Sequence, residues 1–218
     1  MIVTIVHTAL PAVGAQLAAN LALLRGRHGR KVCLLDASPE QMCARWSLER
    51  ARSRLRPTVT AAAVSGGGFA DTLERLAARH DDIVIATDGA DSPECRRALI
   101  AARVALVPLA PEHVDAAAGR ELVTRLDNAR MFNPGLRVLF VTVGGERDPP
   151  PAAQAGVCAY ADRMPTAGVA AAIVHLPALQ WGADVPGRCS SDIDGSAGAA
   201  EMAALYEEVY RFFHDFQE

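Results

Sequence analysis

The sequence contains a single lysine, Lys31, among its 22 lysine and arginine residues. Any mechanism that needs a lysine at another position is therefore excluded. Aromatic residues make up only 5% of the chain, and the formal net charge is -3, which argues against a strongly basic surface for nucleic acid. No apolar run approaches the ~20 residues that a membrane-spanning helix needs.

The cysteines are few and show no pattern of a metal site. There are five cysteines, an odd number, and no two of them form a Cys-x-x-Cys pair. None lies at metal-ligand spacing from a histidine. We interpret them as free thiols in a reducing compartment. The N-terminal segment MIVTIVHTAL has no basic region and is typical of a strand rather than of a signal peptide. We therefore expect a soluble cytoplasmic protein that makes no membrane contact.

Half of the 218 residues are apolar, and short apolar runs alternate with segments of helical periodicity. This rhythm predicts one α/β domain over residues 1–218, with a mostly parallel, twisted sheet and helices on both faces. Strands are expected at about 2–7, 31–36, within 58–69, from 81, 104–111, 136–143 and 171–175. Helices are expected at about 15–27, 39–55, 69–80, 92–102, 113–130, 152–163 and 197–214. In such sheets, ligands bind at the carboxyl ends of the strands.

Several residues predict where helices begin and end. Gly29 is typical of a helix C-terminus, where the chain turns through positive φ. Ser38 followed by proline predicts the start of the second helix, and Ser92 followed by proline predicts the start of the fourth.

Three segments, in order, carry a resemblance to a known family. Residues 20–32 (NLALLRGRHGRKV), 34–46 (LLDASPEQMCARW) and 83–115 are similar to successive motifs of the ParA/MinD-type ATPases. These proteins form a branch of the P-loop fold and include the short ParA proteins of plasmid and chromosome partition. The resemblance covers essentially the whole chain. It implies a P-loop NTPase fold, ATP and Mg²⁺ as ligands, and a ParB-like or other adaptor protein as partner.

The motif that defines this family is missing. The family's phosphate loop reads Lys-Gly-Gly-x-Gly-Lys-(Thr/Ser), whereas residues 9–16 here are ALPAVGAQ. If Gly14 matches the glycine before the lysine, Ala15 takes the lysine position and Gln16 the hydroxyl position. An ungapped match that runs to Asn20 instead places Gly14 at the lysine and Ala15 at the hydroxyl residue. The lysine and the hydroxyl are missing in either register.

Other requirements of a phosphate loop also fail. The family's first signature lysine falls at Ala9 or Leu10. Leu10 and Ala12 carry Cβ atoms where glycines let the main chain close on phosphate, and Pro11 has no N–H to donate. Lys31 is expected at the far end of its strand. We therefore interpret one run of residues as a degenerate phosphate loop: Pro11, Ala12, Val13, Gly14, Ala15 and Gln16.

The acidic residues of the family site are only partly kept. Ala86 stands where the family has the aspartate that ends the Walker B strand, and Asp88 follows two residues later. Asp36 matches the acid that in the family supports water activation. Asp36 is either a relic of that site or a cap for the helix expected near Pro39, and we favour the cap. Two carboxylates without a lysine or a metal would repel a triphosphate.

Other candidates have a structural interpretation beside the functional one. His7 is either a new ligand or base, or a strand-end residue with a satisfied ring. His113 and Asp115 lie where family members contact a partner subunit, although a helix start explains both equally well. Leu10 to Val13 form an apolar run where the family exposes its loop, which predicts an interface.

Two helical features have plain explanations. Tyr206, Tyr210 and Phe213 recur at helical spacing, and the surrounding tail is acidic, so we expect core packing rather than a membrane helix. The arginines in and next to the helices expected at 92–102 and 113–130 are interpreted as a solvated face with at most weak phosphate contact. They are Arg96, Arg97, Arg103, Arg120, Arg125 and Arg130.

Two functions from different classes remain open. In the favoured one, the chain is a pseudo-ATPase without a bound cofactor or metal, a scaffold in DNA segregation or polar localisation that contacts DNA weakly at most. In the alternative, it is an ATPase with a rearranged site built from His7, Gln16 and Asp88, driving partition. The first hypothesis allows a monomer or a homodimer that needs no nucleotide, and we favour the homodimer or a complex with a partner.

Overall fold

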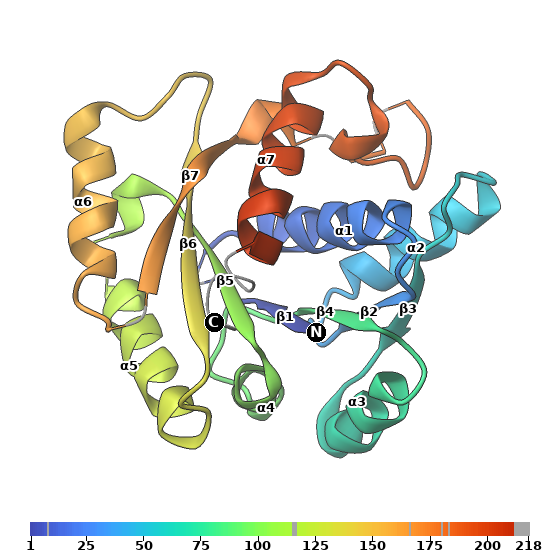
Figure 1. Ribbon diagram of the computed structural model, residues 1–218, viewed down its shortest axis with the longest axis horizontal. Coiled ribbons are helices and arrows are strands. Elements are labelled where there is room, and N and C mark those ends of the chain that lie inside the picture. The colour runs from blue at the N-terminus through green and yellow to red at the C-terminus, as the bar shows by residue number, and fades with distance from the viewer. Residues whose placement is uncertain (8, 115–116, 166, 180, 183, 212–218) are drawn as a thin grey trace.

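The computed structural model describes every residue except 8, 115–116, 166, 180, 183 and 212–218. Within the described part, seven strands form one sheet in which every pairing is parallel (Figure 1). The order across the sheet is β3-β2-β4-β1-β5-β6-β7. The strands are β1 Ile2–Ile5, β2 Val32–Asp36, β3 Thr60–Ala63, β4 Asp82–Ala86, β5 Val104–Leu109, β6 Arg137–Gly144 and β7 Ala167–His175.

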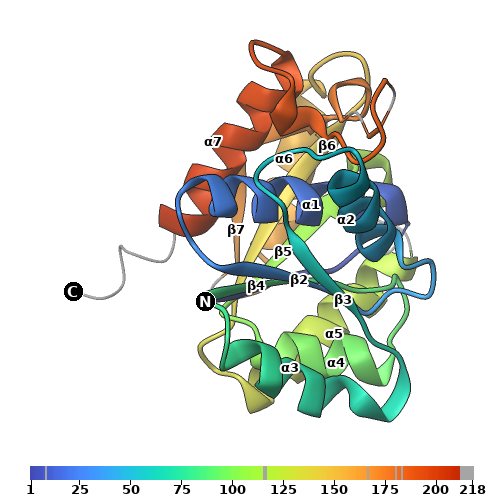
Figure 2. The ribbon, with the colours of Figure 1, turned by 90° about the vertical axis from the view of Figure 1, so that its right-hand side faces the viewer.

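Helices cover both faces of the sheet, as the alternating pattern predicts (Figures 1 and 2). The helices α1, α2 and α7 pack on one face, and α3, α4, α5 and α6 pack on the other. They span α1 Pro11–Arg27, α2 Met42–Arg52, α3 Phe69–Ala77, α4 Pro93–Ala101, α5 Ala117–Phe132, α6 Pro151–Ala161 and α7 Ala197–Arg211. No described helix is both long and apolar enough to cross a membrane.

Successive residues of a strand point alternately into the hydrophobic cores on the two faces of the sheet. In β5, Val104 and Leu106 join the core beneath α1, whereas Ala105 and Val107 join the core beneath α4 and α5. All six residues of β5 are buried. A strand buried on both faces is expected for a parallel sheet, and it explains why these segments are continuous apolar runs.

Two of the predicted helix boundaries are confirmed. Gly29 follows the end of α1 with a φ of +76°, a conformation in which a side chain is strained. The Ser92 side chain accepts a hydrogen bond from Cys95 N at 3.1 Å, as an N-cap does at the start of α4.

Other boundaries differ from the prediction. The first helix begins at Pro11 rather than Ala15, and α2 begins at Met42, with Gln41 in the left-handed region, rather than at Pro39. The helix expected from 113 begins at Ala117, after a 3-10 turn at Pro111–His113. A proline is compatible with the first position of either helix type or of a turn, so the X-Pro pairs did not distinguish these starts.

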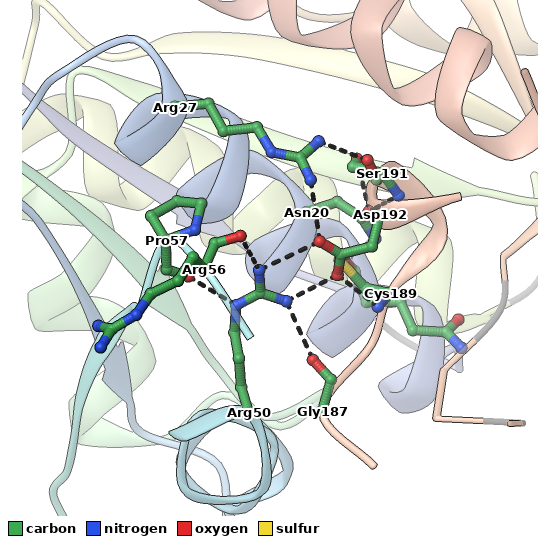
Figure 3. A network of polar contacts seen from close by, with 10 residues as sticks. Asn20, Arg27, Arg50, Arg56, Pro57, Gly187, Cys189, Ser191 and Asp192 are labelled. Atoms are coloured by element: carbon green, nitrogen blue, oxygen red, sulfur yellow. Dashed lines mark hydrogen bonds and ion pairs between the residues drawn. The ribbon is translucent and has the colours of Figure 1, made fainter. Parts of the chain in front are cut away.

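Buried hydrogen bonds and ion pairs connect the segment after β7 to α1 and α2 (Figure 3). Arg50 of α2 is fully buried and makes a two-pronged contact with Asp192, at 2.6 and 3.1 Å. The side-chain oxygen of Asn20 accepts hydrogen bonds from the main-chain N–H and the hydroxyl of Ser191, at 2.9 and 2.7 Å. A Cβ at Gly187 would overlap the main chain of Arg50, so only glycine fits there. The asparagine of the family-like motif therefore has a structural task here.

Candidate functional site at the carboxyl edge of the sheet

The carboxyl ends of three neighbouring strands meet beside the amino end of α1, which is where ligands bind in sheets of this kind. In the parallel register, Ile5 of β1 lies opposite Ala86 of β4, and Ala86 lies opposite Asp36 of β2. His7 and Asp88 follow two residues after β1 and β4. The structure thus gathers the residues of the sequence-predicted site around one edge.

The segment expected to be a degenerate loop is the first part of a helix. Residues 11–16 all belong to α1, and Gly14 N donates to Leu10 O at 2.9 Å. Proline at the first helical position stabilises this start, because its φ is already helical and its missing N–H would be unpaired there. A phosphate loop needs main-chain N–H groups that are free to point at the ligand. Here the Gly14 N–H is used inside the helix.

The His7 ring lies against this first turn. A Cβ at Gly14 would be 2.8 Å from His7 Cδ2, so the glycine is what admits the ring. His7 is only 4% exposed, and its Nδ1 has no hydrogen-bond partner among the described residues. Burial lowers the pKa of His7, and the main chain of Thr87 and the charge of Asp88 offset this only in part. We infer a neutral imidazole that fills space beside α1.

Asp36 acts as a cap, as favoured from the sequence, although the helix it caps begins later than expected. One carboxylate oxygen accepts from Ser38 N and Ser38 Oγ, at 3.1 and 2.7 Å. The other accepts from Ala44 N, in the first turn of α2, at 3.0 Å. Asp36 is fully buried. Both of its oxygens are therefore occupied by the protein itself.

The other polar candidates also have partners within the chain. Asp88 accepts a hydrogen bond from the Ser92 hydroxyl at 3.1 Å and so supports the cap of α4. The Gln16 side-chain amide donates to Leu179 O at 3.3 Å, in the segment after β7. Ala86 is 4% exposed and offers only a methyl group at the end of β4.

A cleft with a volume of about 580 Å³ opens next to the amino end of α1. It is bordered by Leu10, by Pro111, by residues from the end of β6 to Pro150, and by Leu176. Leu176 is 46% exposed. The cleft therefore combines apolar side chains with access from solvent.

The residues predicted to form an interface divide into two groups. Pro11 and Ala12 are exposed and Leu10 is half-buried. Val13 is 4% exposed and packs into the core, because the helical turn points it inward, so its assignment to an exposed patch was wrong. His113 is half-buried at the end of a 3-10 turn. Asp115 lies outside the described residues.

A second cleft, also of about 580 Å³, holds polar residues that the sequence did not suggest. His175 Nδ1 lies 2.9 Å from Glu201 Oε1, and His175 Nε2 lies 3.2 Å from Asp148 Oδ1. The contacts join the end of β7 to α7 and to the loop after β6. These residues are 26 or more positions apart and belong to no motif, so only the fold could bring them together.

ATP and Mg²⁺, which the fold family implies, do not fit the residues at this edge. The first turn of α1 and the His7 ring lie at the expected phosphate position, and Ala86 offers no oxygen ligand. Lys31 comes directly before β2, at the opposite edge of the sheet. Among the described residues, no three histidine, cysteine or acidic side chains are grouped to hold a metal ion. No catalytic step through a nucleotide follows from this geometry.

At the level of sequence, no protein-family model and no curated protein matches the chain. The solved structures do. Cobyrinic acid a,c-diamide synthase from Mycobacterium smegmatis, with an ATP analog and magnesium, superposes with a TM-score of 0.72 and 16% identity over 97% of this chain and 94% of its own. MinD from Pyrococcus furiosus superposes with a TM-score of 0.67 and 18% identity, over 97% and 98%.

A plasmid partition protein from Borrelia burgdorferi superposes with a TM-score of 0.65 and 14% identity, over 97% of this chain and 98% of its own. This chain has the fold of the ParA/MinD-type ATPases. The resemblance drawn from three sequence segments is confirmed at the level of the fold. The ParA/MinD-type fold supports both partition proteins and a biosynthetic enzyme among these neighbours, so function must be argued from the site.

Proposed function

We propose that this chain is a ParA-like positioning protein that acts as a pseudo-ATPase, through protein contacts rather than ATP hydrolysis. One observation carries the proposal. The segment that would cradle phosphate is the first turn of α1, and it packs against the buried His7 ring. Among the described residues there, a triphosphate would find no lysine and no group of metal ligands, and the Gly14 N–H is already used inside the helix. Partition and positioning ATPases among the structural neighbours support the ParA-like role.

The alternative, an ATPase with a rearranged site, uses His7, Gln16 and Asp88. All three are committed to contacts within the chain. His7 is buried beside Gly14, Gln16 reaches Leu179, and Asp88 binds Ser92. A general base must reach its substrate proton within about 3 Å. These contacts would have to break first, so the geometry favours the scaffold.

We further propose that residues 1–218 work as one domain in the cytoplasm and bind a ParB-like or other adaptor protein. The half-buried Leu10, the exposed Pro11 and the cleft beside them supply an apolar contact surface. All five cysteines are free, which suits a reducing compartment. DNA segregation and polar localisation are both compatible with this surface. DNA contact would be weak and indirect.

The proposal predicts assembly that does not respond to nucleotide. Light scattering after gel filtration should give the same mass with and without Mg²⁺-ATP, and the mass of a homodimer is expected. Leu10→Asp should shift the wild-type dimer toward monomer, because it places a charge in the apolar contact. Leu48→Asp is a matched control, since Leu48 is 50% exposed on α2 and lies away from the cleft. A wild type that dimerises only when ATP is added would contradict the proposal.

A further inference from the structure

The pocket between α4 and α5, on the other side of the sheet from α1, contains an unusual arginine. Its volume is about 330 Å³, within the range of small-ligand sites. Arg125 lines this pocket and its side chain is only 5% exposed. The sequence suggested a solvated arginine face here, and for Arg125 that interpretation was wrong. Helix packing of α5 against α4 turns this residue inward.

The Arg125 guanidinium is poorly satisfied. Its contacts with Gly89 O are 3.4 and 3.5 Å long, and its contact with Cys95 Sγ is 3.8 Å. Its Nε is buried without a hydrogen-bond partner, and the nearest carboxylate oxygen, of Asp91, is 3.6 Å away. A well-made N–H···O bond measures about 2.7–3.2 Å.

Arg50, a second buried arginine, shows how the guanidinium of a buried arginine is fully hydrogen-bonded in the same chain. Arg50 is 0% exposed and makes five contacts of 2.6 to 3.2 Å, with Pro57 O, Arg56 O, Gly187 O and both oxygens of Asp192 (Figure 3). Its charge is neutralised by a two-pronged carboxylate. Arg125 is nearly as buried, but it has no two-pronged carboxylate partner among the described residues and only one longer ion pair, with Asp91. A buried charge that is weakly paired is costly.

Asp91 forms an ion pair with Arg125, but only at 3.6 Å, and it is bound at shorter range by another arginine. Arg96 binds both Asp91 oxygens, at 2.8 and 2.6 Å, and lowers the pKa of Asp91. The rest of the pocket wall is largely apolar. Ile100, Met131 and Phe132 line it and are 41%, 77% and 73% exposed. Such exposure of three large apolar side chains around one pocket marks a binding site.

We propose that the α4–α5 pocket binds a carboxylate attached to an apolar group. The carboxylate would accept two parallel hydrogen bonds from Arg125, the arrangement that a guanidinium favours. The apolar group would cover Ile100, Met131 and Phe132. The carboxylate belongs either to a free small acid or to an acidic side chain within an apolar segment of a partner protein. The pocket is lined by α4, α5 and the loop after β4 and not by α1, so the inference does not depend on the pseudo-ATPase proposal.

NMR titration of the full-length protein with two carboxylic acids tests the proposal. Each acid is compared with an uncharged amide analogue of the same shape, called its twin. The free-acid probe is 3-phenylpropionate, paired with 3-phenylpropanamide. The peptide probe is acetyl-Leu-Phe-Asp-Leu-Phe-amide, paired with the peptide that has asparagine in place of aspartate. The small acid should bind with a dissociation constant of about 1 mM, the value expected for a ligand of its size. Tighter binding by the peptide would identify a protein source, and tighter binding by the small acid a free one.

Each acid should bind at least about tenfold more tightly than its twin. Arg125→Met should weaken the acids by a similar factor and leave the twins unchanged, and Arg97→Met is the matched control, an exposed arginine of α4 outside the pocket. The comparison of twins on the wild type needs no variant to fold. Failure of both acids to bind, or equal binding of acids and twins, or acid binding that survives Arg125→Met, would overturn the proposal.

Discussion

At the scale of single residues, side chains that match family positions have taken on structural tasks. Asp36 corresponds to an acid of the family's catalytic site, yet both of its oxygens are used to cap α2 and the preceding turn. Gly14 lies in the segment that the sequence comparison matched to the family's phosphate loop, yet its missing side chain makes room for His7. Retention of a residue type at a site is therefore no indication of retained chemistry here.

Replacing Asp36 tests this interpretation. Asp36→Ala should lower the free energy of unfolding by about 3 kcal/mol, because it removes charge-assisted hydrogen bonds and leaves buried N–H groups unpaired. Urea denaturation measures the change. Ser38→Ala is a milder control, since it removes only one hydroxyl partner and keeps the bond from Ala44. A loss below about 0.5 kcal/mol for Asp36→Ala would mean that the carboxylate is not a structural cap.

His7 predicts a pH dependence of stability. Its burial lowers the pKa below the ordinary 6.5, so on acidification the unfolded chain takes up a proton before the folded protein does. His7 therefore stabilises the fold above that value, and the contribution is lost as the pH falls toward the lowered pKa. Between about pH 7.5 and 5.5, wild type should lose more stability than His7→Asn, which does not titrate. Urea denaturation at both pH values compares them, and equal slopes would contradict a buried neutral imidazole.

At the scale of elements, the first turn of α1 decides what the site can hold. A helix that begins at Pro11 places regular helical main chain where a loop would be needed, and the segment after β7 is tied to the same helix through Gln16 and Asn20. The start of α1 could not be read from the sequence. Apolar periodicity begins at about Ala15, and a proline four residues earlier is typical of loops as well as of helix starts.

Substitutions that restore the family's phosphate loop can show whether the missing side chains or the main-chain conformation prevents nucleotide binding. Ala15→Lys, Gln16→Thr and Ala86→Asp together restore the missing groups, but α1 still begins at Pro11, so no Mg²⁺-ATP binding is expected. Adding Leu10→Gly and Pro11→Gly should release the turn and give measurable affinity by calorimetry. Equal binding by the two variants would show that the helix start is no obstacle. No binding by the variant with all five changes would mean that the site is closed by more than this turn.

A further obstacle to repair depends on the register. If Gly14 stands at the lysine position, Gly14→Lys alone would collide with the His7 ring, because even a Cβ would approach it to 2.8 Å. That variant should be strongly destabilised, and His7→Ser in the same chain should restore much of the loss. This energetic coupling between positions 7 and 14 follows from the fold, and a comparison of sequence motifs could not have predicted it.

At the scale of the whole molecule, the sequence predicted the architecture well and the side-chain pairings poorly. Alternating apolar runs and helical periods predicted all seven strands and the helices on both faces, because each run obeys a local rule. The strand at 104–109 is an example, since continuous burial makes it continuously apolar. The inward turn of Arg125 and the contact of His175 with Glu201 depend on how distant elements pack, so local rules could not predict them.

The central claim is that this ParA/MinD-type fold has no working nucleotide site. Isothermal titration of the wild-type protein with ATP and with ADP, each with and without Mg²⁺, tests it most directly. We expect no measurable heat of binding at millimolar nucleotide, because the lysine, the hydroxyl and the Walker B acid are missing and helix α1 begins where the loop would be. Binding with micromolar affinity that requires Mg²⁺ would contradict the account.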